Sequence, residues 1–104
     1  MSFELLNLNK PLLNALSDLE YVYPTPIQQE SFPIIMSGRD VVGLAQTGTG
    51  KTFAYLLPIL RQLSYSEQRD PRVLILVPTR ELVIQVIAEI HKLTTYMTVR
   101  VTGV

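Results

Sequence analysis

The stretch that most limits the possible folds of this chain is 45-AQTGTGKT-52, because it stands between an apolar run and a helical pattern. Residues 41–46 are predicted to form a buried strand and residues 51–64 a helix. Gly48 and Gly50 allow positive φ, so successive backbone N–H groups can curl around an anion. The start of the helix directs its positive end at the same point. The stretch therefore predicts a phosphate-binding loop at the turn from strand to helix.

Two side chains at the end of this loop indicate a nucleoside triphosphate with a magnesium ion. Lys51 can reach the β- and γ-phosphates, and the Thr52 hydroxyl can ligate Mg²⁺. Both are therefore candidate catalytic residues, and Thr52 is the candidate metal ligand. The other predicted nucleotide contacts in the loop are Gln46, Thr47, Gly48, Thr49 and Gly50. Kinases, GTPases, transporters and helicases all use such a loop, so it does not choose between them.

The order of the apolar patterns predicts an α/β fold. Helices are predicted to begin near Asn9, at Pro26, near Lys51 and near Arg80, and strands to cover 41–46, 73–77 and 98–103. Continuous apolar strands that alternate with helices favour a mostly parallel sheet with helices on both faces. Pro33 is expected to end or kink the second helix, and Pro58 to kink the third.

Length, charge and cysteine content exclude several classes of protein. The 104 residues allow one domain, and no apolar run reaches the roughly 18 residues of a membrane span, so no membrane contact is expected. The absence of cysteine excludes a disulfide framework and a thiolate zinc site, and it favours a cytoplasmic protein. Nine basic and nine acidic residues cancel, so a nucleic acid would have to be bound at a local site rather than by overall charge.

A second motif, 24-PTPIQ-28, can recognise a base. A glutamine amide can accept a hydrogen bond from the amino group of adenine and donate one to its N7, whereas guanine offers only acceptors there. Gln28 on a helix start capped by Thr25 would thus select adenine, with Phe3 or Tyr21 stacked on the ring. Taken alone, a plain proline-capped helix with a surface glutamine is the simpler interpretation.

A third motif, 78-PTREL-82, places a hydroxyl group, an arginine and the N–H groups of a helix start at the carboxyl end of a predicted strand. Ligands of open α/β sheets bind at that edge, and such groups suit the phosphates of a nucleic-acid backbone. A capped helix start with Thr79 as the cap explains the motif equally well when it is taken alone.

Together and in this order, the three motifs resemble those of the DEAD-box ATP-dependent RNA helicases. The resemblance covers nearly the whole chain and implies that residues 1–104 are the N-terminal part of a RecA-like P-loop NTPase domain. It places the glutamine motif at about 3–28, the P-loop at 45–52 and the PTREL motif at 78–82. The resemblance implies alanine as the first residue of the P-loop, which accounts for Ala45.

The resemblance also assigns roles to single residues. Phe3 stands seventeen residues before Glu20, at the spacing of the aromatic that stacks on adenine, and Tyr21 fits the aromatic that follows. Glu20 itself replaces the usual glycine of the family, and Val83 replaces a common alanine. The resemblance implies RNA contacts for Pro78, Thr79 and Arg80, and for Gly103, which resembles the start of a glycine-pair motif.

The resemblance implies that the chain is the ATP-binding portion of an RNA helicase. Such a helicase couples ATP binding and hydrolysis to RNA duplex unwinding. ATP, Mg²⁺ and RNA are the implied ligands, and a second RecA-like domain is expected downstream. No predicted strand ends in the acid that hydrolysis needs, so the 104 residues are expected to bind ATP without hydrolysing it. Strand edges without neighbours predict self-association. Two alternatives stay open: another P-loop NTPase or kinase, and a non-enzymatic module that binds RNA or a partner.

Overall fold

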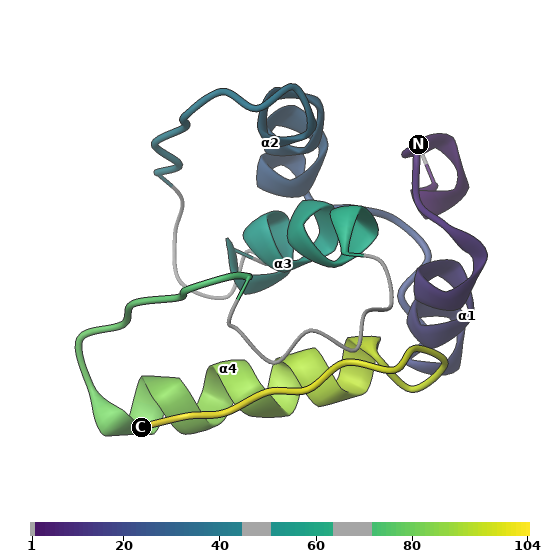
Figure 1. Ribbon diagram of the computed structural model, residues 1–104. Helices are drawn as coiled ribbons and strands as arrows, with labels where there is room; N and C mark the ends of the chain where they lie inside the picture. Colours follow the sequence, from purple (N-terminus) through teal and green to yellow (C-terminus); the bar gives the residue numbers. More distant parts are fainter. Residues whose placement is uncertain (1, 45–50, 64–71) are drawn as a thin grey trace.

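The computed structural model describes residues 2–44, 51–63 and 72–104, which form an assembly of packed helices (Figure 1). The described helices are η1 (Phe3–Leu5), α1 (Lys10–Asp18), α2 (Pro26–Met36), α3 (Lys51–Gln62) and α4 (Arg80–Leu93). The four predicted helix starts are confirmed, because each α-helix begins within one residue of the expected position. Among the described residues, no helix has both the length and the apolar character that crossing a bilayer requires.

The core lies where α3 meets the other three α-helices. In Figure 1, α3 lies between α2 and α4, and its most extensive packing is against α2. Buried side chains from every helix and from the segment between η1 and α1 meet there; they are Phe3, Leu6, Leu8, Leu12, Leu16, Phe32, Phe53, Leu56, Leu57, Leu60, Val86, Ile90 and Leu93. Because apolar positions on α1, α3 and α4 recur at helical spacing, each helix turns one continuous apolar stripe toward this centre.

The three predicted strands are not confirmed. In the described parts of the chain, segments 41–44, 72–77 and 98–104 have no regular secondary structure. A strand exists only where its backbone bonds to a neighbour, and no backbone hydrogen bond between described residues joins one of these segments to another. The segments 72–77 and 98–104 instead line a common groove of about 800 Å³. The α/β prediction therefore holds for the helices, while the sheet remains a prediction.

Prolines inside two helices do not end them. Pro33 was expected to end or kink α2; the helix continues to Met36, so Pro33 does not end it, and the kinks at Pro33 and Pro58 stay predictions. A proline removes only its own N–H donor, and the exposed position of Pro33 lets water satisfy the carbonyl that loses its partner. The chain turns away instead at Gly38, whose φ of +83° suits glycine.

Two hydrogen bonds between distant residues anchor α1 and the chain that leads to it. Arg61, in the last turn of α3, donates from Nε to the carbonyl oxygen of Asn7 at 2.7 Å. The Tyr96 hydroxyl donates to a carboxylate oxygen of Asp18 at the end of α1, and this bond is the main reason why the pKa of Tyr96 is raised. The first ties the chain that leads to α1 to α3, and the second ties the end of α1 to the turn that follows α4.

The end of α1 carries a strained residue. Glu20 has a φ of +63°, while the N–H of Glu20 donates to the carbonyl of Ser17 and that of Tyr21 to the carbonyl of Leu16. This pair of bonds is a Schellman motif, in which the left-handed position normally belongs to glycine. Glu20 thus holds this turn at a conformational cost, at the position where the resemblance implies a glycine.

Glu20→Gly is expected to raise the free energy of unfolding by about 1 kcal/mol, because glycine adopts the left-handed conformation without steric cost. Urea denaturation followed by circular dichroism measures the change. Glu30→Gly is the matched control, since Glu30 is an exposed residue inside α2. This substitution should lower the free energy of unfolding by about 1 kcal/mol. Destabilisation by both substitutions would contradict the assignment of strain to Glu20.

Candidate functional site

A reciprocal pair of hydrogen bonds fixes the glutamine that was predicted to recognise a base. The Oγ1 of Thr25 accepts from the backbone N–H of Gln28 at 3.4 Å, and the Oε1 of Gln28 accepts from the backbone N–H of Thr25 at 2.9 Å. This capping box holds the Gln28 side chain at 4% exposure. A carbonyl oxygen can accept two hydrogen bonds, so the same Oε1 can close the helix and accept from an adenine amino group.

The two predicted stacking residues lie in different surroundings. Tyr21 is 50% exposed, and its ring forms a T-shaped pair with that of Phe53, with a centroid distance of 5.5 Å and an interplanar angle of 85°. Phe3 is only 4% exposed and packs in the core, while its N–H donates to the carbonyl of Val22 at 3.0 Å. Stacking on a base needs an accessible ring, and Tyr21 is much more exposed than Phe3. The adenine-stacking role of Phe3 stays a prediction.

Phe53 is the residue whose part in the site was not foreseen. Its position directly after Thr52 on an apolar stripe predicts burial, but nothing in the sequence predicts that its ring contacts Tyr21. The contact joins the segment before α2 to the first turn of α3. It therefore connects the residues expected to read the base with those expected to hold the phosphates.

The first turn of α3 carries the two predicted phosphate and metal residues. Lys51 is exposed and Thr52 is half-buried at the described start of α3. Burial raises the pKa of Tyr55, one turn further on, and a hydrogen bond with the Thr52 side chain acts in the opposite direction. The predicted contacts of the preceding loop, namely Gln46, Thr47, Gly48, Thr49 and Gly50, lie outside the described residues.

The residues predicted to face RNA gather at the start of α4. Thr79 caps this helix by accepting from the N–H of Leu82 at 3.2 Å, and Pro78, Thr79 and Arg80 are all exposed. The final segment of the chain runs along α4 toward the same end (Figure 1). A Cβ added to Gly103 would lie 2.9 Å from Cγ1 of Val83, one turn beyond the cap. The structure thus brings all four residues to one end of one helix.

Comparisons of the sequence and of the structure find similar known proteins. The model of the DEAD/DEAH box helicase family matches residues 25–104. The ATP-dependent RNA helicase DeaD of Escherichia coli K12 is 52% identical over 85 residues, which is 82% of this chain and 13% of that protein. A crystal structure of a DEAD box protein from Methanococcus jannaschii has a TM-score of 0.85 at 35% identity and covers 95% of this chain and 27% of its own. The RNA-helicase Prp28 of Chaetomium thermophilum, bound to ADP, has a TM-score of 0.82 at 39% identity, covering 98% of this chain and 26% of its own.

Proposed function

The chain belongs to the DEAD/DEAH box helicase family, and from this membership we propose that it forms the ATP-binding part of an ATP-dependent RNA helicase. The chain spans 13% of the length of its Escherichia coli relative, so RNA unwinding is proposed for the whole protein and nucleotide binding for these residues. We also propose a cytoplasmic protein that works with a second RecA-like domain downstream.

The observation that carries the proposal is the contact between Tyr21 and Phe53. It fixes the segment that leads into the capped start of α2, with Gln28, against the helix that begins with Lys51 and Thr52. Base recognition and phosphate binding require such neighbours, because one nucleotide must reach both groups of residues. The extensive packing of α2 on α3 keeps the two groups in a constant relation.

The donor groups present fit ATP with Mg²⁺. Lys51 offers an exposed ammonium group at a helix start, and Thr52 offers a hydroxyl beside it. When bound, the metal ion neutralises negative charge on the β- and γ-phosphates. The side chain of Lys51 would bind the phosphates, Thr52 would hold the ion, and Gln28 would orient the adenine. Tyr21 would cover the open face of the base.

Titration with fluorescent analogues of ADP and GDP tests this proposal. The chain is expected to prefer the adenine analogue, and Gln28→Ala to lower that preference by about tenfold, because a bidentate amide–adenine pair contributes about 1–3 kcal/mol. Lys51→Ala is expected to lower the affinity for both analogues by about tenfold to a hundredfold, since it removes charged hydrogen bonds to phosphate.

Gln29→Ala is the matched control for the base. Gln29 neighbours Gln28 on α2, but its Nε2 donates to the carbonyl of Pro24 at 3.3 Å, outside the capping box. This substitution is expected to leave the preference for adenine unchanged. Equal affinity for both analogues in the unsubstituted chain, or a chain that binds neither, would contradict the proposal.

We propose further that these 104 residues bind ATP without hydrolysing it. Hydrolysis by P-loop enzymes needs a carboxylate that holds Mg²⁺, and no predicted strand of the sequence ends in an acid. Phosphate release by the purified chain, with and without RNA, is expected to equal that of Lys51→Ala. RNA-stimulated release that Lys51→Ala abolishes would show that the proposal is wrong.

RNA binding and the sheet complete the proposed function. We propose that Pro78, Thr79, Arg80 and Gly103 contact the RNA backbone, and their gathering at the start of α4 supports this. We also propose that 41–46, 73–77 and 98–103 become strands of a mostly parallel sheet when further strands lie beside them. The TM-score of 0.85 with a longer solved relative supports this second proposal, since the described residues follow the path of that chain.

A further inference from the structure

The backbone position of Tyr21 is set by the end of α1. The Tyr21 N–H donates to the carbonyl oxygen of Leu16 at 2.9 Å, and the Glu20 N–H donates to that of Ser17 at 3.0 Å. Glu20 makes this turn at a φ of +63°, a conformation that is costly for a residue other than glycine. A strained turn persists only where the surrounding structure holds it in place. The position of Tyr21 therefore depends on what stabilises the last turn of α1.

α1 has little in its own sequence to stabilise that turn. The helix has nine residues, and isolated helices shorter than roughly 12–15 residues are marginal in water. Its last turn contains no basic side chain, which would interact favourably with the carbonyl groups at a helix end, and its last residue is the acidic Asp18. A contact from another part of the chain is therefore needed at this end of the helix.

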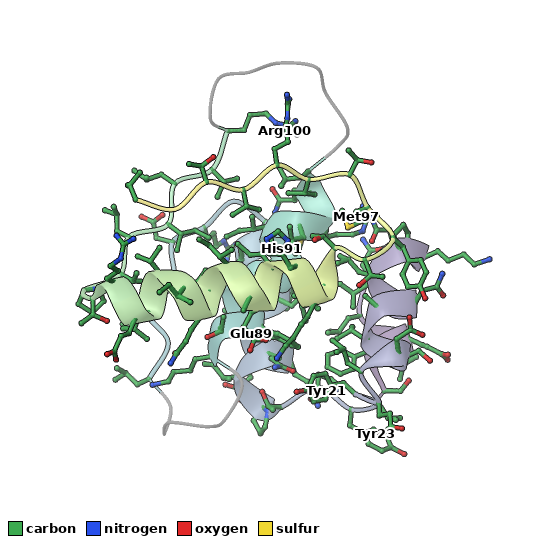
Figure 2. The ribbon with its side chains drawn as sticks, turned by 90° about the horizontal axis from the view of Figure 1, so that it is seen from below. Tyr21, Tyr23, Glu89, His91, Met97 and Arg100 are labelled. Atoms are coloured by element: carbon green, nitrogen blue, oxygen red, sulfur yellow. The ribbon has the colours of Figure 1, made fainter. Side chains whose placement is uncertain are left out.

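Tyr96 supplies such a contact from the turn that follows α4. Its hydroxyl donates to a carboxylate oxygen of Asp18, and this bond raises the pKa of Tyr96, so the phenol keeps its proton as the donor. The turn is itself fixed to α4, because the N–H and the Oγ1 of Thr94 both donate to the carbonyl oxygen of Ile90, at 3.0 and 2.8 Å. Figure 1 and Figure 2 both show this turn, which carries Met97, beside α1. The last residue of α1 is thus tied to the end of a 14-residue helix.

We propose that Tyr96 is a positioning residue for base recognition. Its hydrogen bond with Asp18 holds the last turn of α1, and that turn holds Tyr21 where its ring can cover the base. The inference rests on the proposed contact of Tyr21 with adenine. It goes beyond that contact, because it gives a role in the site to a residue 78 positions from Asp18 in the sequence.

Nuclear magnetic resonance of the chain without nucleotide tests the position of Tyr21 directly. Tyr96→Phe removes one oxygen atom from a side chain that is 49% exposed, so the fold is expected to remain. The cross-peaks between the ring protons of Tyr21 and Phe53, whose centroids lie 5.5 Å apart, are expected to lose intensity. Thr95→Ala is the matched control, because its Oγ1 donates to the carbonyl oxygen of Lys92 at 3.2 Å, within the end of α4. It is expected to leave the cross-peaks unchanged.

Titration calorimetry measures the consequence for nucleotide affinity. Tyr96→Phe is expected to lower the affinity for ADP by about twofold to fivefold, the range that one exposed interaction with a charged group can supply. The affinity for pyrophosphate, which has no base, is expected to stay unchanged, because Lys51 and Thr52 lie on α3. In a chain that already carries Asp18→Ala, Tyr96→Phe should have no further effect on ADP binding.

Three results would overturn the proposal. They are unchanged ring contacts and ADP affinity in Tyr96→Phe, an equal loss of affinity for pyrophosphate, and additive effects of Tyr96→Phe and Asp18→Ala. A loss of stability alone belongs to the first of these, because a bond that only stabilises the chain leaves the affinity of the folded protein unaltered. Equal affinity of the unsubstituted chain for adenine and guanine would contradict the proposed function instead. The ring contacts are measured without nucleotide, so they would still test the position of Tyr21.

Discussion

Phe53→Ala is expected to lower the free energy of unfolding by about 3–5 kcal/mol, because it empties a ring-sized space beside α2 and α3. Phe53 is buried in the core, and its ring forms a T-shaped pair with that of Tyr21. A domain of 104 residues has a total stability of about 5–15 kcal/mol, so this one substitution brings the chain close to unfolding. Urea denaturation followed by circular dichroism measures the loss.

Phe53→Leu separates the core from the contact with Tyr21. Leucine keeps most of the apolar volume but cannot present an aromatic edge, so its cost should be smaller than that of alanine. A double-mutant cycle with Tyr21→Leu is expected to give a coupling of about 0.5–1.5 kcal/mol, the range for aromatic pairs. A coupling near zero would mean that the two rings are neighbours without a mutual contribution to stability.

Gly103→Ala is expected to cost about 1–3 kcal/mol, because the added methyl group would overpack the surface of α4. Its Cβ would lie 2.4 Å from Cδ1 of Ile87 and 2.9 Å from Cγ1 of Val83. The end of the isoleucine side chain can rotate away, whereas the β-branched valine is stiff. Val83 is therefore the residue that forbids a side chain at position 103.

Val83→Ala is expected to relieve this clash, so the double substitution should be less costly than the sum of the two single ones. The coupling measured by thermal denaturation of the four proteins should exceed about 1 kcal/mol. Ile84→Ala is the control, because Ile84 is not among the side chains that the added methyl group would meet. Additive effects of Gly103→Ala and Val83→Ala would contradict the close approach of the last segment to α4.

Local chemistry explains why the helices are predictable and the sheet is not. Thr25 and Thr79 cap α2 and α4, and a cap acts on N–H groups only two or three residues away. The strands depend on pairing between segments that are distant in the sequence. The run 73–77 shows that its side chains are apolar, but it does not specify which backbone lies beside it. Among the described residues, no backbone hydrogen bond pairs this run with another segment.

The candidate site divides in the same way. The sequence predicts Thr25 as the cap of α2, and the glycine loop predicts Lys51 and Thr52 at a helix start. The return bond from the N–H of Thr25 to Gln28 was not predicted. The burial of Phe3 depends on its backbone bond to Val22, which forms only when the chain folds back on itself. Spacing along a sequence therefore indicates which residues share a site, but not which ring in it is left open.

The capping box has a consequence for spectroscopy. The backbone proton of Thr25 is held by the Oε1 of Gln28, the same atom that is proposed to receive the adenine amino group. Any base that shares this oxygen lengthens or polarises the bond, so the amide resonance of Thr25 shifts. A single proton at the start of α2 thus serves as an intrinsic, label-free signal of base recognition, distinct from any signal that arises at the phosphates.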